Sequence, residues 1–200
     1  MSNIYPENKV RVSEVVGCLR KSFFKRYINK RENITTFSLW GRIAENEIKR
    51  KILPRFKGYF ENVVCQKGIL IGHPDFVDYI NQRVIELKFR WRRNPKIADL
   101  SQANAYACML GFQQFTIRVS WLEYTPNLHL NYSDLTFPAR YDRFKVLLEK
   151  ADLLLLSLQG RNPYLIRSYP QWNYECLYCP YTWECQELSN WQDLEKGLSN

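Results

Sequence analysis

The chain has 200 residues, of which 46% are hydrophobic and 15% aromatic, and this composition excludes a disordered or low-complexity protein. Its 29 lysines and arginines against 20 acidic residues leave a net charge of +9, which favours an anionic partner, nucleic acid ahead of a membrane surface. No segment has the roughly 20 apolar residues of a membrane span, and residues 1–16 lack the apolar stretch of a signal peptide. We therefore expect one compact cytoplasmic domain with reduced cysteines and no membrane partner.

Helical periodicity organises the first quarter of the chain. Apolar residues spaced by three and four predict a helix over residues 13–30, whose other face is basic and includes Arg20 and Lys21. A second helix is predicted over residues 36–53, because the chain cannot easily continue helically into Pro54.

Strand-like patterns follow. Residues 62–90 contain three such runs, VVCQKGILIG, DFVDYI and VIELKFR. A helix is predicted over residues 95–110, ended by Gly111. The runs QFTIRVSWLEYTP and LHLNYSDL are predicted strands, and residues 138–158 are predicted to form a helix with one leucine-rich buried face.

This order of strands and helices predicts an α/β fold in which helices flank a mixed central sheet. Within one domain we expect a helical part over residues 1–61 and a core over residues 62–168. Residues 169–200 form a cysteine-rich and aromatic-rich segment, too irregular to pack as a layer of its own.

Three polar side chains interrupt the apolar strands near the middle of the chain. If DFVDYI and VIELKFR form an antiparallel hairpin that turns at residues 81–82, position 75 lies opposite position 88. Because side chains alternate between faces, Asp75, Glu86 and Lys88 then share one face of the sheet. A turn of two or four residues preserves this parity, whereas a turn of three moves Asp75 to the other face. The same parity places Asp78 on the apolar face opposite Ile85, where we assign it no role.

Two neighbouring carboxylates repel each other, and a hard divalent cation such as Mg²⁺ or Mn²⁺ relieves that repulsion. Such an ion polarises a phosphate and makes hydroxide available near neutral pH. Lys88 is then placed to orient the attacking water or to counter the charge that grows on the phosphorus centre. This chemistry is phosphodiester hydrolysis; the alternative is a structural salt bridge on the surface of a sheet.

Basic residues and one tryptophan follow Lys88 directly in RWRRNPK: Arg90, Trp91, Arg92, Arg93 and Lys96. Basic side chains neutralise phosphates, and an aromatic ring stacks on an unpaired base. We interpret this run as a contact for single-stranded nucleic acid, with a solvated charge run as the alternative.

Cysteines near the end of the chain have the metal-ligand spacing C-x2-C-x5-C: Cys176, Cys179 and Cys185. Cys18, beside a basic run that favours the thiolate, is our candidate for a fourth ligand. The spacing fits zinc and an iron–sulphur cluster alike. Cys65 and Cys108 lie in apolar patterns, so we expect both to be buried small side chains.

The stretch GHPD, residues 72–75, followed after ten residues by Glu86-Leu-Lys88, resembles the catalytic core of the PD-(D/E)xK nucleases, particularly their RecB-like branch. Gln102 and Tyr106 resemble that branch's Q-x-x-x-Y motif, and their spacing places both on one helical face, although an ordinary amphipathic helix has the same spacing. That branch often carries a metal-binding histidine in a G-x-x-x-H pattern. Here Glu45 stands in the place of the histidine, so the resemblance implies Glu45 as an oxygen ligand.

With one early cysteine and a late cysteine triad around this core, nearly the whole chain is similar to the CRISPR-associated iron–sulphur exonucleases. The resemblance implies four cluster ligands: Cys18, Cys176, Cys179 and Cys185. It implies a [4Fe-4S] cluster more often than [2Fe-2S], Mg²⁺ or Mn²⁺ at the carboxylates, and 5′-to-3′ digestion of single-stranded DNA ends. It also implies a role in preparing CRISPR spacers beside integrase proteins, and it leaves the oligomeric state open, a homo-oligomer included. The alternatives are a RecB-like repair nuclease outside CRISPR and a catalytically silent iron–sulphur scaffold that binds DNA.

Overall fold

The structure is a computed structural model that describes residues 8–28, 36–52, 59–60, 62–90, 93–125, 127–166, 176 and 179–188. The helices are α1 (Val12–Val15), α2 (Leu19–Ile28), α3 (Thr36–Ile52), α4 (Ile97–Leu110), α5 (Tyr141–Gln159) and the short 3-10 helix η2 (Pro163–Leu165). The strands are β1 (Val10–Arg11), β2 (Tyr59–Phe60), β3 (Cys65–Lys67), β4 (Leu70–Gly72), β5 (Phe76–Asp78), β6 (Arg83–Phe89), β7 (Gln114–Thr125) and β8 (Asn127–Pro138).

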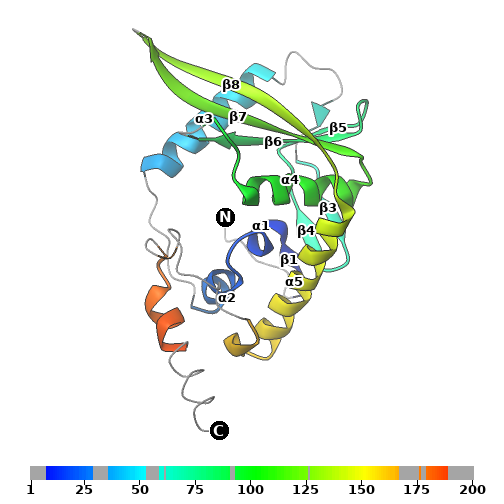
Figure 1. Cartoon of the computed structure of the whole chain (residues 1–200), viewed down its shortest axis with the longest axis vertical. Helices are drawn as coiled ribbons and strands as arrows, with labels where there is room; N and C mark the ends of the chain where they lie inside the picture. Colours follow the sequence, from blue (N-terminus) through cyan, green and yellow to red (C-terminus); the bar gives the residue numbers. More distant parts are fainter. Residues whose placement is uncertain are drawn as a thin grey trace.

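A five-stranded mixed sheet in the order β2-β5-β6-β7-β8 crosses the upper part of the molecule as drawn in Figure 1. Strands β6 and β7 run parallel, and the other neighbours are antiparallel. A parallel pair needs a long crossover, which α4 supplies between β6 and β7. The predicted mixed central sheet flanked by helices is therefore confirmed.

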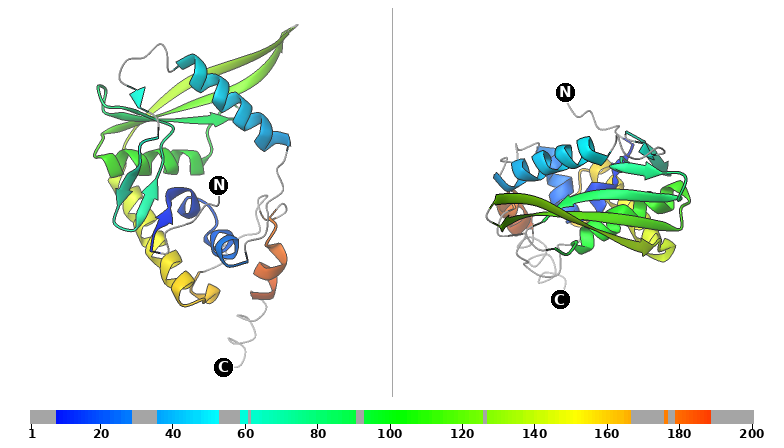
Figure 2. Two further views of the ribbon diagram at one scale, coloured as in Figure 1. Left: turned by 180° about the vertical axis from the view of Figure 1, so that it is seen from behind. Right: turned by 90° about the horizontal axis from the view of Figure 1, so that it is seen from above.

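Helices cover both faces of this sheet, α3 on one side and α4 on the other (Figure 2). On the α3 face, Ile85 and Leu87 of β6 pack with Phe76 and Ile48 in a small buried cluster. Burying each such apolar side chain stabilises the fold by about 1.5–3 kcal/mol. Because side chains alternate along β6, the residues between them, Glu86 among them, point toward α4.

A smaller three-stranded sheet, β1-β4-β3, was not predicted. The run VVCQKGILIG folds as the β3–β4 hairpin rather than as one strand, and Gly68 takes the left-handed backbone conformation with a φ of 58° at its turn. Strand β1 joins β4 in parallel across 60 residues of sequence, and a strand of two residues has no periodicity to detect.

The predicted first helix is wrong in one respect, because α1 and α2 are separate. The break contains Gly17, and glycine costs about 1 kcal/mol relative to alanine inside a helix. The other three predicted helices are confirmed as α3, α4 and α5, and Gly111 ends α4 with a φ of 76°. Strand β8 is longer than predicted, since it pairs with β7 along its whole length.

Residues from the two ends of the chain pack together below the main sheet. Phe24 of α2 stacks on Tyr181 with ring centroids 6.1 Å apart, and both belong to the same buried cluster as Ile166. Residues 182–188 form a helical segment beside α2. In the part of the chain that the structure describes, no helix has the length and apolar character needed to cross a lipid bilayer.

Candidate active site

The β5–β6 hairpin brings the predicted acidic residues together. Phe76 pairs with Ile85 and Asp78 with Arg83, so the turn has four residues, 79–82. The predicted pairing of position 75 with position 88 is therefore wrong by two residues, and the register places Asp75 beside Glu86. A four-residue turn keeps the parity, so the predicted common face for the polar residues is confirmed.

Asp78 has a role that was not predicted. It lies opposite Arg83 rather than Ile85, on the apolar face, and is only 1% exposed. Its carboxylate accepts hydrogen bonds from the backbone N–H of Asn81 (3.1 Å), from Asn81 Nδ2 (2.8 Å) and from Arg83 Nε (3.0 Å). These hydrogen bonds hold the four-residue turn, and with it the register that sets Asp75 beside Glu86.

Glu86 is the most deeply buried acidic residue of the site, at 3% exposed. Its Oε1 accepts from Lys88 Nζ at 2.8 Å, and its Oε2 has no hydrogen-bond partner among the described residues. Burial, and then the charge of Asp75, raise the pKa of Glu86 to about 7 against the lowering effect of Lys88. Asp75 is held in place by the Leu87 N–H, which donates to its Oδ2 at 2.9 Å.

Lys88 is positioned by a chain of hydrogen bonds from α4. Its Nζ donates to Gln102 Oε1 (3.3 Å), and Gln102 Nε2 donates to Tyr106 Oη (3.0 Å). The two predicted α4 residues are therefore linked to the predicted lysine, Gln102 directly and Tyr106 through Gln102. Burial opposes the charge of Lys88, but the Glu86 carboxylate prevails and raises its pKa. The ammonium group therefore stays protonated.

Gly72 in the GHPD stretch makes room for Tyr106. A Cβ atom at position 72 would lie 2.2 Å from Tyr106 Cε1, far inside van der Waals contact. Any side chain there would push the Tyr106 ring away and displace Gln102, which depends on it. Gly72 thus supports the position of Lys88 indirectly, through Tyr106 and Gln102.

Helix α3 contributes two side chains to the same place. Lys49 Nζ lies 3.2 Å from Asp75 Oδ1, and burial, followed by the charge of Asp75, raises the pKa of Glu45. Glu45 and Lys49 are one helical turn apart, which is the only sequence signal for Lys49, and we did not predict it. The sheet and α3 therefore converge on Asp75.

Among the described residues, no three histidine, cysteine, aspartate or glutamate side chains lie close enough to form a metal-binding group. Lysines neutralise the carboxylates instead, Lys49 at Asp75 and Lys88 at Glu86. The residues nevertheless fit a hard divalent cation. Burial and then Asp75 raise the pKa of both Glu45 and Glu86, and Glu86 Oε2 is a buried acceptor to which no described residue donates.

The predicted nucleic-acid residues separate into different environments. Arg90 forms a forked ion pair with Asp99, which also accepts from the Lys96 backbone N–H (2.8 Å) at the start of α4. Arg93 points outward with 63% of its side chain exposed, and Lys96 is also exposed. Two of the predicted residues, Trp91 and Arg92, lie outside the described residues.

The cysteines predicted as ligands gather where the chain's ends pack together. Burial raises the pKa of Cys18, and Cys185 and Cys179 raise it further. Burial likewise raises the pKa of Cys179, with smaller contributions from Cys176 and Cys185. Cys179 therefore lies within electrostatic range of the other three thiols, but the described thiols do not lie close enough together to form a metal-binding group. The predicted burial of the remaining two, Cys65 and Cys108, is confirmed, since each is 2% exposed.

Arg20 was placed on a basic helix face by the sequence, but it is buried, at 1% exposed. Its Nε donates to the Ile166 carbonyl (2.9 Å), and its Nη1 donates to Cys185 Sγ (3.6 Å). Arg20 therefore links α2 to residues 166 and 185 in the interior of the protein.

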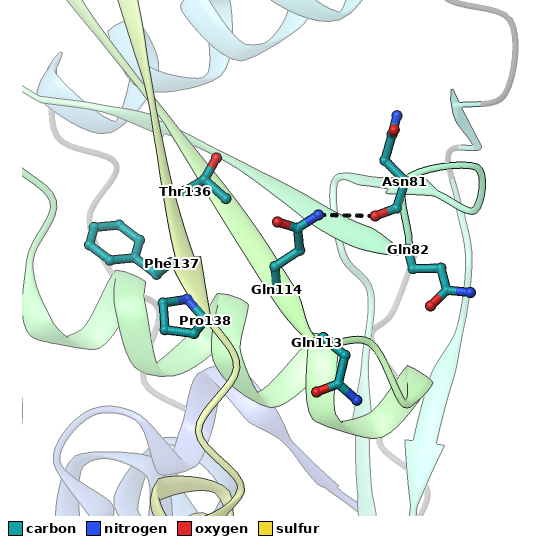
Figure 3. A pocket seen from close by; sticks show the side chains of 7 residues that line it. All are labelled: Asn81, Gln82, Gln113, Gln114, Thr136, Phe137 and Pro138. Carbon is teal, nitrogen blue, oxygen red and sulfur yellow. Dashed lines mark hydrogen bonds between the residues drawn. The ribbon is translucent and has the colours of Figure 1, made fainter.

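A pocket of about 470 Å³ lies at the start of β6 and β7, away from the carboxylates (Figure 3). Its lining residues are Asn81, Gln82, Gln113, Gln114, Thr136, Phe137 and Pro138. Gln114 Nε2 donates to the Asn81 carbonyl at 3.1 Å across it. The lining has amide and hydroxyl groups but no titratable side chain, so we place the chemistry at the carboxylates instead.

No protein-family model and no curated protein sequence matches the chain. Solved structures do. SSO0001 is 16% identical with a TM-score of 0.65, over 90% of this chain and 87% of that one. A phage-related exonuclease from Haemophilus somnus 129PT is 13% identical with a TM-score of 0.56, over 79% and 95%. The alkaline exonuclease LHK-Exo from Laribacter hongkongensis is 15% identical with a TM-score of 0.57, over 79% and 91%, and its complex with dAMP gives a TM-score of 0.55.

At these identities the likeness establishes the fold. The chain has the mixed α/β fold of two solved exonucleases, and the match covers most of its length.

Proposed function

We propose that the chain is a metal-dependent DNA exonuclease. Its proposed catalytic residues for phosphodiester hydrolysis are Asp75, Glu86 and Lys88. The observation that carries the proposal is Glu86, a buried carboxylate with one oxygen on Lys88 and the other without a partner in the part of the chain that the structure describes. Burying such a group is unfavourable unless a cation compensates it, and functional sites are where this arrangement recurs. The fold shared with two exonucleases supports the same conclusion.

Asp75 and Glu86, with Glu45, would hold Mg²⁺ or Mn²⁺, and the bound ion would polarise the phosphate and make hydroxide available near neutral pH. Glu86 must lose its proton to serve as a ligand. Lys88, kept protonated by Glu86 and oriented by Gln102, neutralises negative charge that develops on the phosphate oxygens. Tyr106 holds the Gln102 amide in the orientation that accepts from Lys88.

The substrate that we propose is the end of a single DNA strand, digested 5′ to 3′. The net charge of +9 supports a polyanionic substrate, and a protein of the same fold, LHK-Exo, has been crystallised with dAMP. The polarity, the cytoplasmic setting and the role in CRISPR spacer preparation beside integrase proteins rest on the family resemblance of the motifs. A RecB-like repair nuclease outside CRISPR would use the same site.

The four cysteines would hold an iron–sulphur cluster, [4Fe-4S] more often than [2Fe-2S] in the family that the chain resembles. Their mutual effects on thiol pKa and the hydrogen bond from Arg20 to Cys185 support this assignment. The cluster would join the segment before α2 to residues 176–185. Its role would then be structural, because the carboxylate site lies on the other side of α4.

The experiment is a time course on anaerobically purified protein, with single-stranded DNA labelled at either end and with Mg²⁺, Mn²⁺ or a chelator. We expect nucleotides to be released from the 5′ end only when a divalent ion is present. Lys88→Met should abolish release and leave DNA binding unchanged, whereas Lys145→Met, at an exposed lysine of α5, should change neither. DNA binding without cleavage under any ion would favour the silent scaffold, and a colourless, zinc-loaded protein would contradict the cluster.

A further inference from the structure

Trp121 lies on the same sheet face as the proposed catalytic residues. Lys88 pairs with Val119 in the parallel β6–β7 ladder, and Trp121 is two residues further along the same face of β7. Two residues span about 7 Å of a strand. The Arg90 N–H donates to the Ser120 carbonyl (2.9 Å), which continues the pairing to this point, and Figure 1 shows the β7–β8 hairpin running on past the end of β6.

Arg93 lies over the Trp121 ring. Its guanidinium carbon is 4.8 Å from the ring centroid, and its Nη2 is 3.2 Å from Glu123 Oε1. Glu123 is fixed in turn by Asn131, whose Nδ2 donates to Oε2 at 2.7 Å. The Trp121 ring and the Glu123 carboxylate together hold the guanidinium in place, while 63% of the Arg93 side chain remains exposed.

A guanidinium that is held over an aromatic ring and is still largely exposed suits one class of ligand. Planar bases stack on Arg and on aromatic rings, and this stacking tolerates any base sequence. Bases inside a duplex are covered by their neighbours and their partners, so only an unpaired base can reach the platform. Trp121 Nε1 makes no hydrogen bond with any described residue, so the indole serves this platform through its face.

We propose that Arg93 and Trp121 form a subsite that stacks the unpaired nucleobase next to the phosphodiester bond that is cut. The inference rests on the proposed nuclease function and specifies how that site selects single strands over duplexes. If Arg93 only contacted a phosphate, binding would not depend on whether a base is present, whereas binding to a stacking subsite does.

The test is a scan with short single-stranded oligonucleotides that each lack one base at successive positions from the 5′ end. Binding is measured with Ca²⁺ in place of a catalytic ion. For the wild type we expect one position where loss of the base weakens binding roughly 5- to 100-fold, the range of single base stacks. Trp121→Ala should bind all oligonucleotides equally weakly, and Trp121→Phe should keep part of the position dependence, because it retains an aromatic face.

Two further variants keep the result interpretable. Arg93→Lys preserves the charge but removes the planar guanidinium, so its DNA binding should no longer depend on which base is missing. Arg143→Lys, at an exposed arginine of α5, should keep that dependence. Arg93 is exposed, so Arg93→Lys carries the test if Trp121→Ala does not fold. The subsite is refuted, even if cleavage is normal, if wild-type binding does not depend on which base is missing. It is also refuted if Arg93→Lys shows the same dependence as the wild type. A position-dependent scan without cleavage would refute the nuclease and leave the subsite standing.

Discussion

Replacing Glu86 by glutamine should stabilise the metal-free protein at pH 8. Glu86→Gln keeps the shape of the side chain and mimics the protonated acid. Burial and Asp75 raise the pKa of Glu86 from its ordinary value of 4.5 to about 7, so the folded state binds this proton more tightly than the unfolded state does. The free energy of unfolding therefore falls as the pH rises from about 4.5 to about 7, and the loss is complete above that range.

The size of the effect follows from the same shift. Each tenfold change in proton affinity is about 1.4 kcal/mol, so a rise from 4.5 to about 7 corresponds to about 3 kcal/mol. In a chain of 200 residues this raises the melting temperature by about 6–12 °C. The assay is thermal unfolding with a chelator at pH 8 and pH 4.5. We expect the gain at pH 8 only, and none for Glu149→Gln, at an exposed glutamate of α5.

A divalent ion should make the wild type more stable than Glu86→Gln at pH 8. Mn²⁺ at about 1,000 times its dissociation constant stabilises the wild type by about 4.1 kcal/mol, which exceeds the gain of about 3 kcal/mol from Glu86→Gln, but it should not stabilise a protein that lacks this ligand. Equal melting temperatures for the two proteins at pH 8 without metal, or a less stable Glu86→Gln, would refute the reasoning that the carboxylate is destabilising until a cation binds.

Three further substitutions test the surroundings of the site. Lys49→Met should lower the Mn²⁺ concentration for half-maximal cleavage about twofold to fivefold, because it removes a partly exposed competing cation from Asp75; a higher requirement would contradict this. Asp78→Ala should reduce the free energy of unfolding by about 2–3 kcal/mol in urea titrations, since it removes the hydrogen bonds of the turn, whereas Asp142→Ala at an exposed site should have little effect. Arg20→Met should lower the iron content per chain after anaerobic reconstitution, and an unchanged content would exclude the role assigned to this buried guanidinium.

The common face of Asp75, Glu86 and Lys88 was predictable because alternation along a strand depends only on local sequence. The register was not, since Asn81 and Gln82 look like a two-residue turn. The hydrogen bonds from Asn81 to the Asp78 side chain favour a turn of four instead. A register error of one residue would have moved Asp75 to the other face. The actual error was two residues, so the predicted face remained correct.

Lys49 and Arg20 escaped prediction for a different reason. Both lie in helices whose sequence pattern shows an amphipathic face but not the element that covers it. Lys49 reaches the site because α3 packs against β5 and β6, and Arg20 is buried because residues 166 and 185 fold back onto α2. Packing between segments that are distant in the sequence produces no periodic pattern of residues from which it could be predicted. The basic residues after Lys88 show the same limit, since only the structure separates Arg90, paired with Asp99, from the exposed Arg93.

Single-turnover cleavage of 5′-labelled single-stranded DNA by wild type and Glu86→Gln tests the central claim most directly. The reaction is run with saturating Mn²⁺ at pH 8, above the pKa of about 7 for Glu86. We expect Glu86→Gln to cleave at least about 100-fold more slowly with unchanged DNA affinity, because a metal ligand contributes several kcal/mol of charge stabilisation. Cleavage by Glu86→Gln within a few-fold of the wild-type rate would contradict a hydrolytic site at these carboxylates.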